Sequence, residues 1–85
     1  MPDLQKQFAA AAANSKNLDE RPDNDTLLKI YALYKQGLAG DAEGSRPGFG
    51  DMIGRAKYDA WAKLKGLSRE DAMRQYVALI NSLNG

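Results

Sequence analysis

A lysine stands beside two tyrosines in the stretch KIYALYKQGLAGD, residues 29–41. Each residue of an α-helix turns the side chain by about 100°, which places Lys35 between Tyr31 and Leu28 on the arc that apolar residues occupy. Tyr34 lies on the other flank of this arc. An ammonium group next to phenol hydroxyls is a set of donors suited to an anion such as phosphate. The spacing therefore makes Lys35 a candidate for binding an anionic ligand.

Lys57 repeats this pattern on a second predicted helix. The same geometry places it between Leu64 and Trp61, within an apolar stripe that begins at Ile53. A lone lysine in such a place usually lays its alkyl stem on apolar surface and extends its ammonium into water. Burial of an unpaired ammonium would be costly, and neither stripe carries an acidic residue to pair with it. Two such lysines in one short chain favour a half-open groove whose counter-ion is an external anion.

Tyrosines complete the chemistry of this groove. A tyrosine ring stacks on planar groups, and its hydroxyl can hydrogen-bond a phosphate oxygen. Tyr31 and Lys35 are four residues apart and therefore project in the same direction. Tyr76, in the apolar stripe of the last predicted helix, is a further candidate, and Lys16 lies at the edge of the first helix's apolar side. Core packing is the alternative role for each tyrosine and for Trp61, whereas the groove interpretation indicates a ligand with a phosphate, a flat ring and an apolar tail.

The composition narrows the range of functions. The 85 residues contain no histidine and no cysteine, and the net charge is +1. These absences disfavour a histidine general base, thiol chemistry, disulfides and the usual metal ligands, so we expect no enzyme activity, no cofactor and no metal site. Basic and acidic residues are interleaved along the chain, which argues against a nucleic-acid partner. No stretch approaches the roughly 20 apolar residues of a membrane span, and FAAAAA, residues 8–13, is interpreted as helix rather than secretion signal, so we expect a cytoplasmic protein.

Four helices, each begun by a residue type that caps helix N-termini, are predicted to position these side chains. The first runs from Asp3 to about Lys16, the second from Asp23 or Asn24 to about Leu38, the third from Asp51 through Leu64, and the fourth from Ser68 to about Leu83. Gln36, which shares its side of the second helix with charged residues, is predicted to face solvent. Residues 40–50 form a glycine-rich loop. We therefore predict an all-α four-helix bundle in one domain spanning residues 1–85.

Three stretches of the chain resemble the acyl-CoA-binding protein family. They are PDNDTLLKIYALYKQGLAGD, RPGFGDMIGRAKYDAW and LKGLSREDAMRQY, and the resemblance extends in order over essentially the whole chain. Similarity to this family implies an up-down-down-up bundle of four helices. It also implies a monomer that binds medium- to long-chain fatty acyl-CoA thioesters without transforming them, as an intracellular carrier and buffer of the acyl-CoA pool. The partners that it implies are acyl-CoA esters, with transient contacts to acyl-CoA-using enzymes or membranes and no stable membrane insertion.

The resemblance also assigns ligand contacts to individual residues, in three groups. These are Tyr31, Lys35 and Lys57 for the 3′-phosphate on the ribose of coenzyme A, Tyr34, Lys16 and Ala12 for the adenine region with Tyr76 completing the site, and Phe8, Leu27 and Leu28 for the acyl groove. Every one of these assignments is an expectation that rests on the similarity of the motifs.

Two positions depart from the family's pattern. Tyr58 stands where the family usually has tryptophan, and its place on the helix, off the packed stripe, leads us to expect altered contacts at the rim of the site rather than lost binding. Asp23 stands where the family prefers serine or threonine, and aspartate caps a helix equally well. The alternative function, a helical protein-interaction module, would use the same apolar arc to bind a partner helix or peptide.

Overall fold

Four α-helices make up most of the chain in the computed structural model, which describes residues 3–84. They are α1 (Leu4–Asn14), α2 (Asn24–Ala39), α3 (Met52–Ala62) and α4 (Arg69–Leu83), and a short 3₁₀ helix, η1 (Ser15–Asn17), follows α1. No strand occurs in the part of the chain that the structure covers. The all-α class predicted from the sequence is confirmed.

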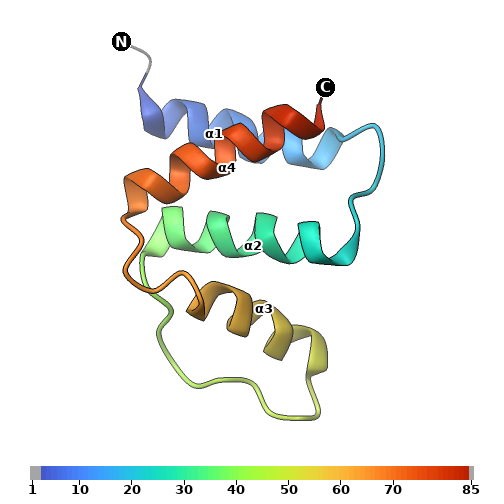
Figure 1. The fold of residues 1–85 in the computed structure, drawn as a ribbon, viewed down its shortest axis with the longest axis vertical. Helices are drawn as coiled ribbons and strands as arrows, with labels where there is room; N and C mark the ends of the chain where they lie inside the picture. The colour runs from blue at the N-terminus through green and yellow to red at the C-terminus, as the bar shows by residue number, and fades with distance from the viewer. Residues whose placement is uncertain (1–2, 85) are drawn as a thin grey trace.

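The helices are arranged in an up-down-down-up order (Figure 1). Helices α1 and α4 lie side by side and run in the same direction, whereas α2 and α3 run in the opposite direction. Helix α2 is central, since it packs against α4 on one side and α3 on the other. The molecule measures 42 × 28 × 15 Å, and its shortest dimension is little more than the diameter of about 10–12 Å of one helix. A bundle this thin leaves part of the α2 surface open.

The start of each helix is stabilised by a side chain that accepts a hydrogen bond from a backbone N–H. The acceptors are the carboxylate of Asp3 (2.9 Å from the amide nitrogen of Gln5), the carboxylate of Asp23 (2.8 Å from that of Thr26), the carboxylate of Asp51 (3.0 Å from that of Gly54) and the hydroxyl of Ser68 (3.1 Å from that of Asp71). These caps confirm the predicted starts and select Asp23 over Asn24. They are local interactions, which explains why the sequence predicts them well.

Two helices end earlier than predicted. Helix α1 stops at Asn14 rather than near Lys16, because the next residues tighten into η1. Helix α3 stops at Ala62 rather than Leu64, and the chain then turns toward Gly66, whose φ of 92° lies in the left-handed region that glycine adopts without strain.

The core lies between α1, α2 and α4. An aromatic cluster forms its centre: the ring centroid of Phe8 lies 5.4 Å from that of Tyr34 and 5.1 Å from that of Tyr76. Gly37 allows α2 to approach this cluster, because a Cβ at that position would lie 3.0 Å from Phe8 Cζ. Leu33 of α2 is also buried in the core.

The prediction for Gln36 is wrong, since its side chain is 0% exposed. Its Nε2 donates to Asp41 Oδ1 and to the carbonyl oxygen of Leu67, both at 2.8 Å. The loop after α2 and the turn before α4 fold over this end of α2 and cover its polar side. The Gly66 N–H, together with the Gln36 amide, holds the pKa of the Asp41 carboxyl below its usual value.

The apolar arc of α2 is not its core face, in agreement with the half-open groove inferred from the sequence. The residues that α2 buries are Ala32, Leu33, Gln36 and Gly37, on the other side of the helix. The arc that carries Leu28 and Tyr31 is half-buried instead and faces an open cavity. The lysine on this arc is therefore at the edge of a groove and not in a packed core.

Candidate functional site

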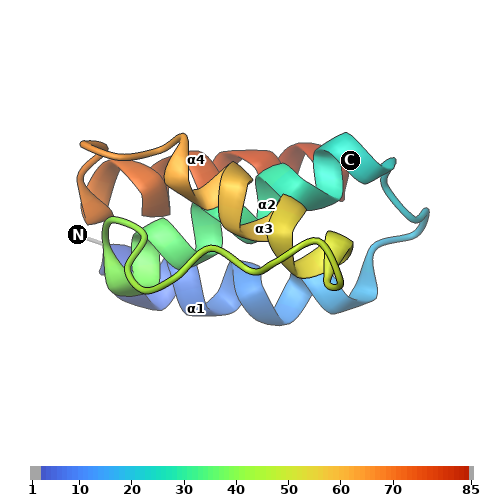
Figure 2. The same ribbon diagram turned by 90° about the horizontal axis from the view of Figure 1, so that it is seen from below.

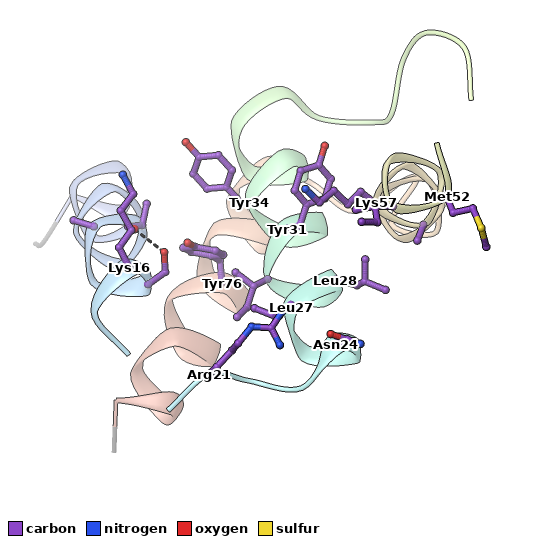
Figure 3. A pocket seen from close by; sticks show the side chains of 16 residues that line it. Lys16, Arg21, Asn24, Leu27, Leu28, Tyr31, Tyr34, Met52, Lys57 and Tyr76 are labelled. Atoms are coloured by element: carbon purple, nitrogen blue, oxygen red, sulfur yellow. Dashed lines mark hydrogen bonds between the residues drawn. The ribbon is translucent and has the colours of Figure 1, made fainter. Parts of the chain in front are cut away.

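A groove with a volume of about 1110 Å³ runs along the open face of α2. One wall is formed by the end of α1 with η1, and the other by the first turns of α3, while Tyr76 of α4 closes the floor (Figure 3). The lining is mainly apolar, with Leu27, Leu28 and Ile30 contributed by α2 and Ala56 by α3. The groove therefore combines an apolar surface with a wide opening to solvent.

Most of the residues singled out in the sequence meet in this groove. Those that line it are Ala12, Lys16, Leu27, Leu28, Tyr31, Tyr34, Lys57 and Tyr76. The four α-helices and η1 all contribute to them, so the fold gathers residues that are distant in the sequence. This convergence supports the groove interpretation over independent core packing of each tyrosine.

Two predicted residues lie outside the lining as the structure describes it. Phe8 is buried in the core, where its ring stacks against Tyr34 at an interplanar angle of 22°. Phe8 therefore lies behind the wall of the groove. Its helical position alone could not distinguish this place from one in the wall itself. Lys35 lies next to the groove, and its Nζ is 5.0 Å from the centroid of the Trp61 ring.

The ammonium groups of both anomalous lysines rest on aromatic rings. The Nζ of Lys57 lies 5.4 Å from the centroid of the Tyr31 ring, so Tyr31 joins the two helices through a cation–π contact. Lys57 is exposed and Lys35 is half-buried. Neither ammonium is enclosed in a dry core.

The charged residues of the lining are all basic. They are Lys16, Arg21 and Lys57, and within residues 3–84 no carboxylate lines the groove. The net charge of the chain is only +1, so this local excess is a property of the groove and not of the whole molecule. The charge of this lining favours an anionic ligand over a cationic one.

Arg21 and the start of α3 are site residues that the sequence did not identify. Arg21 lies in the linker between η1 and α2 (Figure 3), outside every helix predicted from the sequence. Met52 and Ile53 line the groove from α3. Ile53 shares an apolar stripe with Lys57, and this shared stripe is the one signal that could have placed it in the groove.

Tyr76 joins the core to the groove. Its ring packs against Phe8 and Tyr34, and the residue is 2% exposed. Burial raises the pKa of the Tyr76 phenol, an effect that a hydrogen bond with the Ser15 hydroxyl partly offsets. The phenol is therefore protonated at neutral pH and can donate a hydrogen bond to a ligand.

The loop of residues 40–51 is fastened to α3 by two side chains. Arg46 donates two hydrogen bonds to the Asp59 carboxylate, at 2.7 and 2.6 Å, and this pairing holds the pKa of Asp59 below its usual value. The hydroxyl of Tyr58 donates to the carbonyl oxygen of Gly44 at 3.0 Å. Tyr58 therefore anchors the loop, a contact that its predicted place at the rim did not reveal.

Trp61 ties the same loop to the core side of α3. Its indole N–H donates to the carbonyl oxygen of Gly40 at 2.8 Å, and the side chain is buried. The Trp61 ring also contacts the ammonium of Lys35. Trp61 thus sets the position of α3 and of one site lysine together.

The described residues do not form a metal site or a membrane-spanning helix. Among residues 3–84, no group of three or more histidine, cysteine, aspartate or glutamate side chains is placed to hold a metal ion. Within that range no helix combines the length and the apolar character that crossing a membrane requires.

Comparisons with known proteins agree on one family. Residues 5–80 match the family model described as "Acyl CoA binding protein". The chain is 52% identical to the acyl-CoA-binding protein homolog of Manduca sexta, covering 94% of this chain and 90% of that protein. It is 50% identical to acyl-CoA-binding protein homolog 1 of Caenorhabditis elegans, covering 89% and 88% of the two chains. The structure is similar to the crystal structure of Oryza sativa acyl-CoA-binding protein 2, with a TM-score of 0.91, 36% identity, and coverage of 95% of this chain and 90% of that one.

Proposed function

Since the chain belongs to the acyl-CoA-binding protein family, we propose that it carries medium- to long-chain fatty acyl-CoA thioesters and buffers their pool in the cytoplasm. The observation that carries this proposal is the groove itself, whose charged residues are basic and whose remaining lining is largely apolar. An acyl-CoA ester has the matching composition, with phosphates at one end and an alkyl chain at the other. The protein acts as a monomer and passes its ligand to acyl-CoA-using enzymes.

The 3′-phosphate of coenzyme A is bound between α2 and α3. Lys57 and the Tyr31 hydroxyl approach it from the two walls of the groove, and their present cation–π contact keeps them within reach of one anion. Lys35, one helical turn beyond Tyr31, moves from the Trp61 ring to the phosphate. A phosphate oxygen is a better partner for an ammonium than an aromatic ring, because both groups are fully charged.

The adenine ring lies toward α1. Tyr34 offers aromatic surface there, Tyr76 lies at the floor, and Lys16 stands at the edge of the groove on η1 (Figure 3). Ala12 is small enough to admit a flat ring beside the helix. The protonated phenol of Tyr76 donates a hydrogen bond to the nucleotide.

The acyl chain lies on the apolar part of α2. Leu27 and Leu28 form its bed, and Met52 and Ile53 of α3 form the opposite side. Phe8, also expected at the acyl chain, packs against Tyr34 and Tyr76 in the core instead. Each methylene buried along the groove adds about 0.8 kcal/mol to binding, so affinity rises with chain length until the chain passes the end of α3.

The ligand is released unchanged. Acyl transfer needs an activated nucleophile, and the chain contains no histidine or cysteine to supply or activate one. Incubation of the protein with palmitoyl-CoA should therefore release no free thiol above the rate of the buffer. Sustained release of thiol would contradict this part of the proposal.

Native mass spectrometry of protein purified from cells tests the proposed function. We expect a mass increment equal to that of one acyl-CoA, identified by fragmentation to coenzyme A and a fatty acyl group. The variant Lys57→Gln should carry a smaller liganded fraction than the wild-type chain, whereas Lys63→Gln, which alters an exposed lysine outside the groove, should match the wild type. A stoichiometric polypeptide in place of acyl-CoA would support the alternative of a protein-interaction module.

A further inference from the structure

An apolar tip lies where the loop of residues 40–51 enters α3. It consists of Phe49, Met52 and Ile53, whose exposed fractions are 85%, 77% and 73%. Soluble proteins commonly expose single apolar side chains, but three within five consecutive residues form a patch of the kind that marks an interaction site. Neither the caps nor the core explains this tip.

The apolar tip protrudes from the body of the bundle. A Cβ added at Gly48 or at Gly50 would meet no atom of the described residues within 4 Å. The loop runs along the outer edge of α3, away from α1 and α4 (Figures 1 and 2). The Arg55 guanidinium lies 4.1 Å from the centroid of the Phe49 ring, so a cation stands beside this apolar side chain.

The apolar tip is continuous with the groove. Met52 and Ile53 are among the residues that line it, whereas Phe49 lies beyond its lining. An apolar strip therefore leads from the outermost point of the loop into the groove, along the first turn of α3. A molecule that contacts the tip also contacts the mouth of the groove.

Positive charge surrounds the tip and the mouth. Arg55 stands beside Phe49, and Lys57 and Arg21 lie in the lining of the mouth. The acidic residue among positions 49–53 is Asp51, whose carboxylate accepts a hydrogen bond from the Gly54 N–H at 3.0 Å. A surface that complements the tip must therefore offer an apolar region for the three side chains and negative charge around that region.

We propose that the apolar tip inserts into the interface of an anionic lipid bilayer, with the mouth of the groove facing the membrane. Three side chains are too few for a standard protein interface, which takes about 20–30 residues on each side. A bilayer accepts a few apolar side chains flanked by cations, because its headgroups supply the negative charge and its acyl region the apolar medium. Insertion into the bilayer does not depend on the proposed function. Its consequence, that an acyl chain could pass directly from the bilayer into the groove, does rest on the proposed function.

Co-sedimentation of the unliganded protein with vesicles tests the insertion. One set of vesicles contains equal parts phosphatidylcholine and phosphatidylserine, and the other contains phosphatidylcholine alone. We expect the wild-type chain to bind the anionic vesicles more strongly, and Phe49→Ser to lower this partitioning about tenfold. The matched control is Leu38→Ser, which removes another exposed apolar side chain from the C-terminal turn of α2, and it should change partitioning by less than about twofold.

Two outcomes would overturn the proposal. Absence of wild-type binding to either kind of vesicle would show that the tip does not insert into a bilayer. Equal losses from Phe49→Ser and Leu38→Ser would show that binding depends on overall hydrophobicity and not on the tip. Circular dichroism of both variants establishes that each is folded.

Calorimetry in solution separates this proposal from the proposed function. Phe49 lies outside the lining of the groove, so Phe49→Ser should bind monomeric palmitoyl-CoA as tightly as the wild-type chain does. A loss of this affinity in Phe49→Ser would assign Phe49 to the ligand site and overturn its membrane role. Failure of the proposed function would be visible separately, as wild-type protein that binds vesicles but not palmitoyl-CoA in solution.

Discussion

Replacement of Lys57 by glutamine tests how the phosphate is recognised. A hydrogen bond to a charged group is worth about 1.5–3 kcal/mol. Lys57 is exposed, so solvent and salt screen its ammonium and the lower end of this range applies. We therefore expect Lys57→Gln to weaken palmitoyl-CoA binding about tenfold, which corresponds to about 1.4 kcal/mol.

Calorimetry with two ligands isolates this interaction. The second ligand, 3′-dephospho-palmitoyl-CoA, lacks only the phosphate that Lys57 is proposed to hold, so the substitution should weaken its binding by less than about twofold. Lys63→Gln serves as the control on the same segment and should leave both affinities unchanged. Equal losses for the two ligands would refute the reasoning, because Lys57 would then act on another part of the ligand or on the fold.

Three further predictions concern the scaffold of the site. Gly37→Ala should destabilise the chain by about 1 kcal/mol in urea denaturation. The new Cβ would lie 3.0 Å from Phe8, and this close contact outweighs a helix-propensity gain of about 1 kcal/mol. A stabilised variant would contradict this. Trp61→Phe should cost about 1–3 kcal/mol, since it removes the donor to the carbonyl oxygen of Gly40, and an unchanged unfolding midpoint would count against that role. The pKa of Asp59 is lowered in the folded state, so its ion pair stabilises the fold above the unfolded-state pKa of about 4, and this contribution is lost as the pH falls through the lower folded-state pKa. Asp59→Asn should therefore show a smaller loss of stability between neutral and acidic pH than the wild-type chain does.

Local chemistry explains what the sequence predicts correctly. The four capping residues were identified because each bonds to a backbone N–H two or three residues away. The two lysines were identified because their helical positions conflict with the residues around them. Both inferences need only the geometry of a single helix.

Contacts between distant segments explain what the sequence does not predict. Gln36 shares its helical side with charged residues, and its burial depends on Leu67, which lies 31 residues away. Arg21 carries no signal in its linker, since its place in the groove depends on how η1 and α2 are joined. Lys35 was placed on the correct arc, but its contact with Trp61 depends on how α3 packs against α2.

The central claim is that one groove binds both ends of an acyl-CoA ester. Titration calorimetry of the wild-type chain with monomeric palmitoyl-CoA, and separately with palmitate and with coenzyme A, tests this claim most directly. We predict one palmitoyl-CoA per chain, with an affinity far above that of either part, because the basic residues and the apolar lining then act on one ligand. Palmitate bound as tightly as palmitoyl-CoA, or the absence of palmitoyl-CoA binding, would contradict the account.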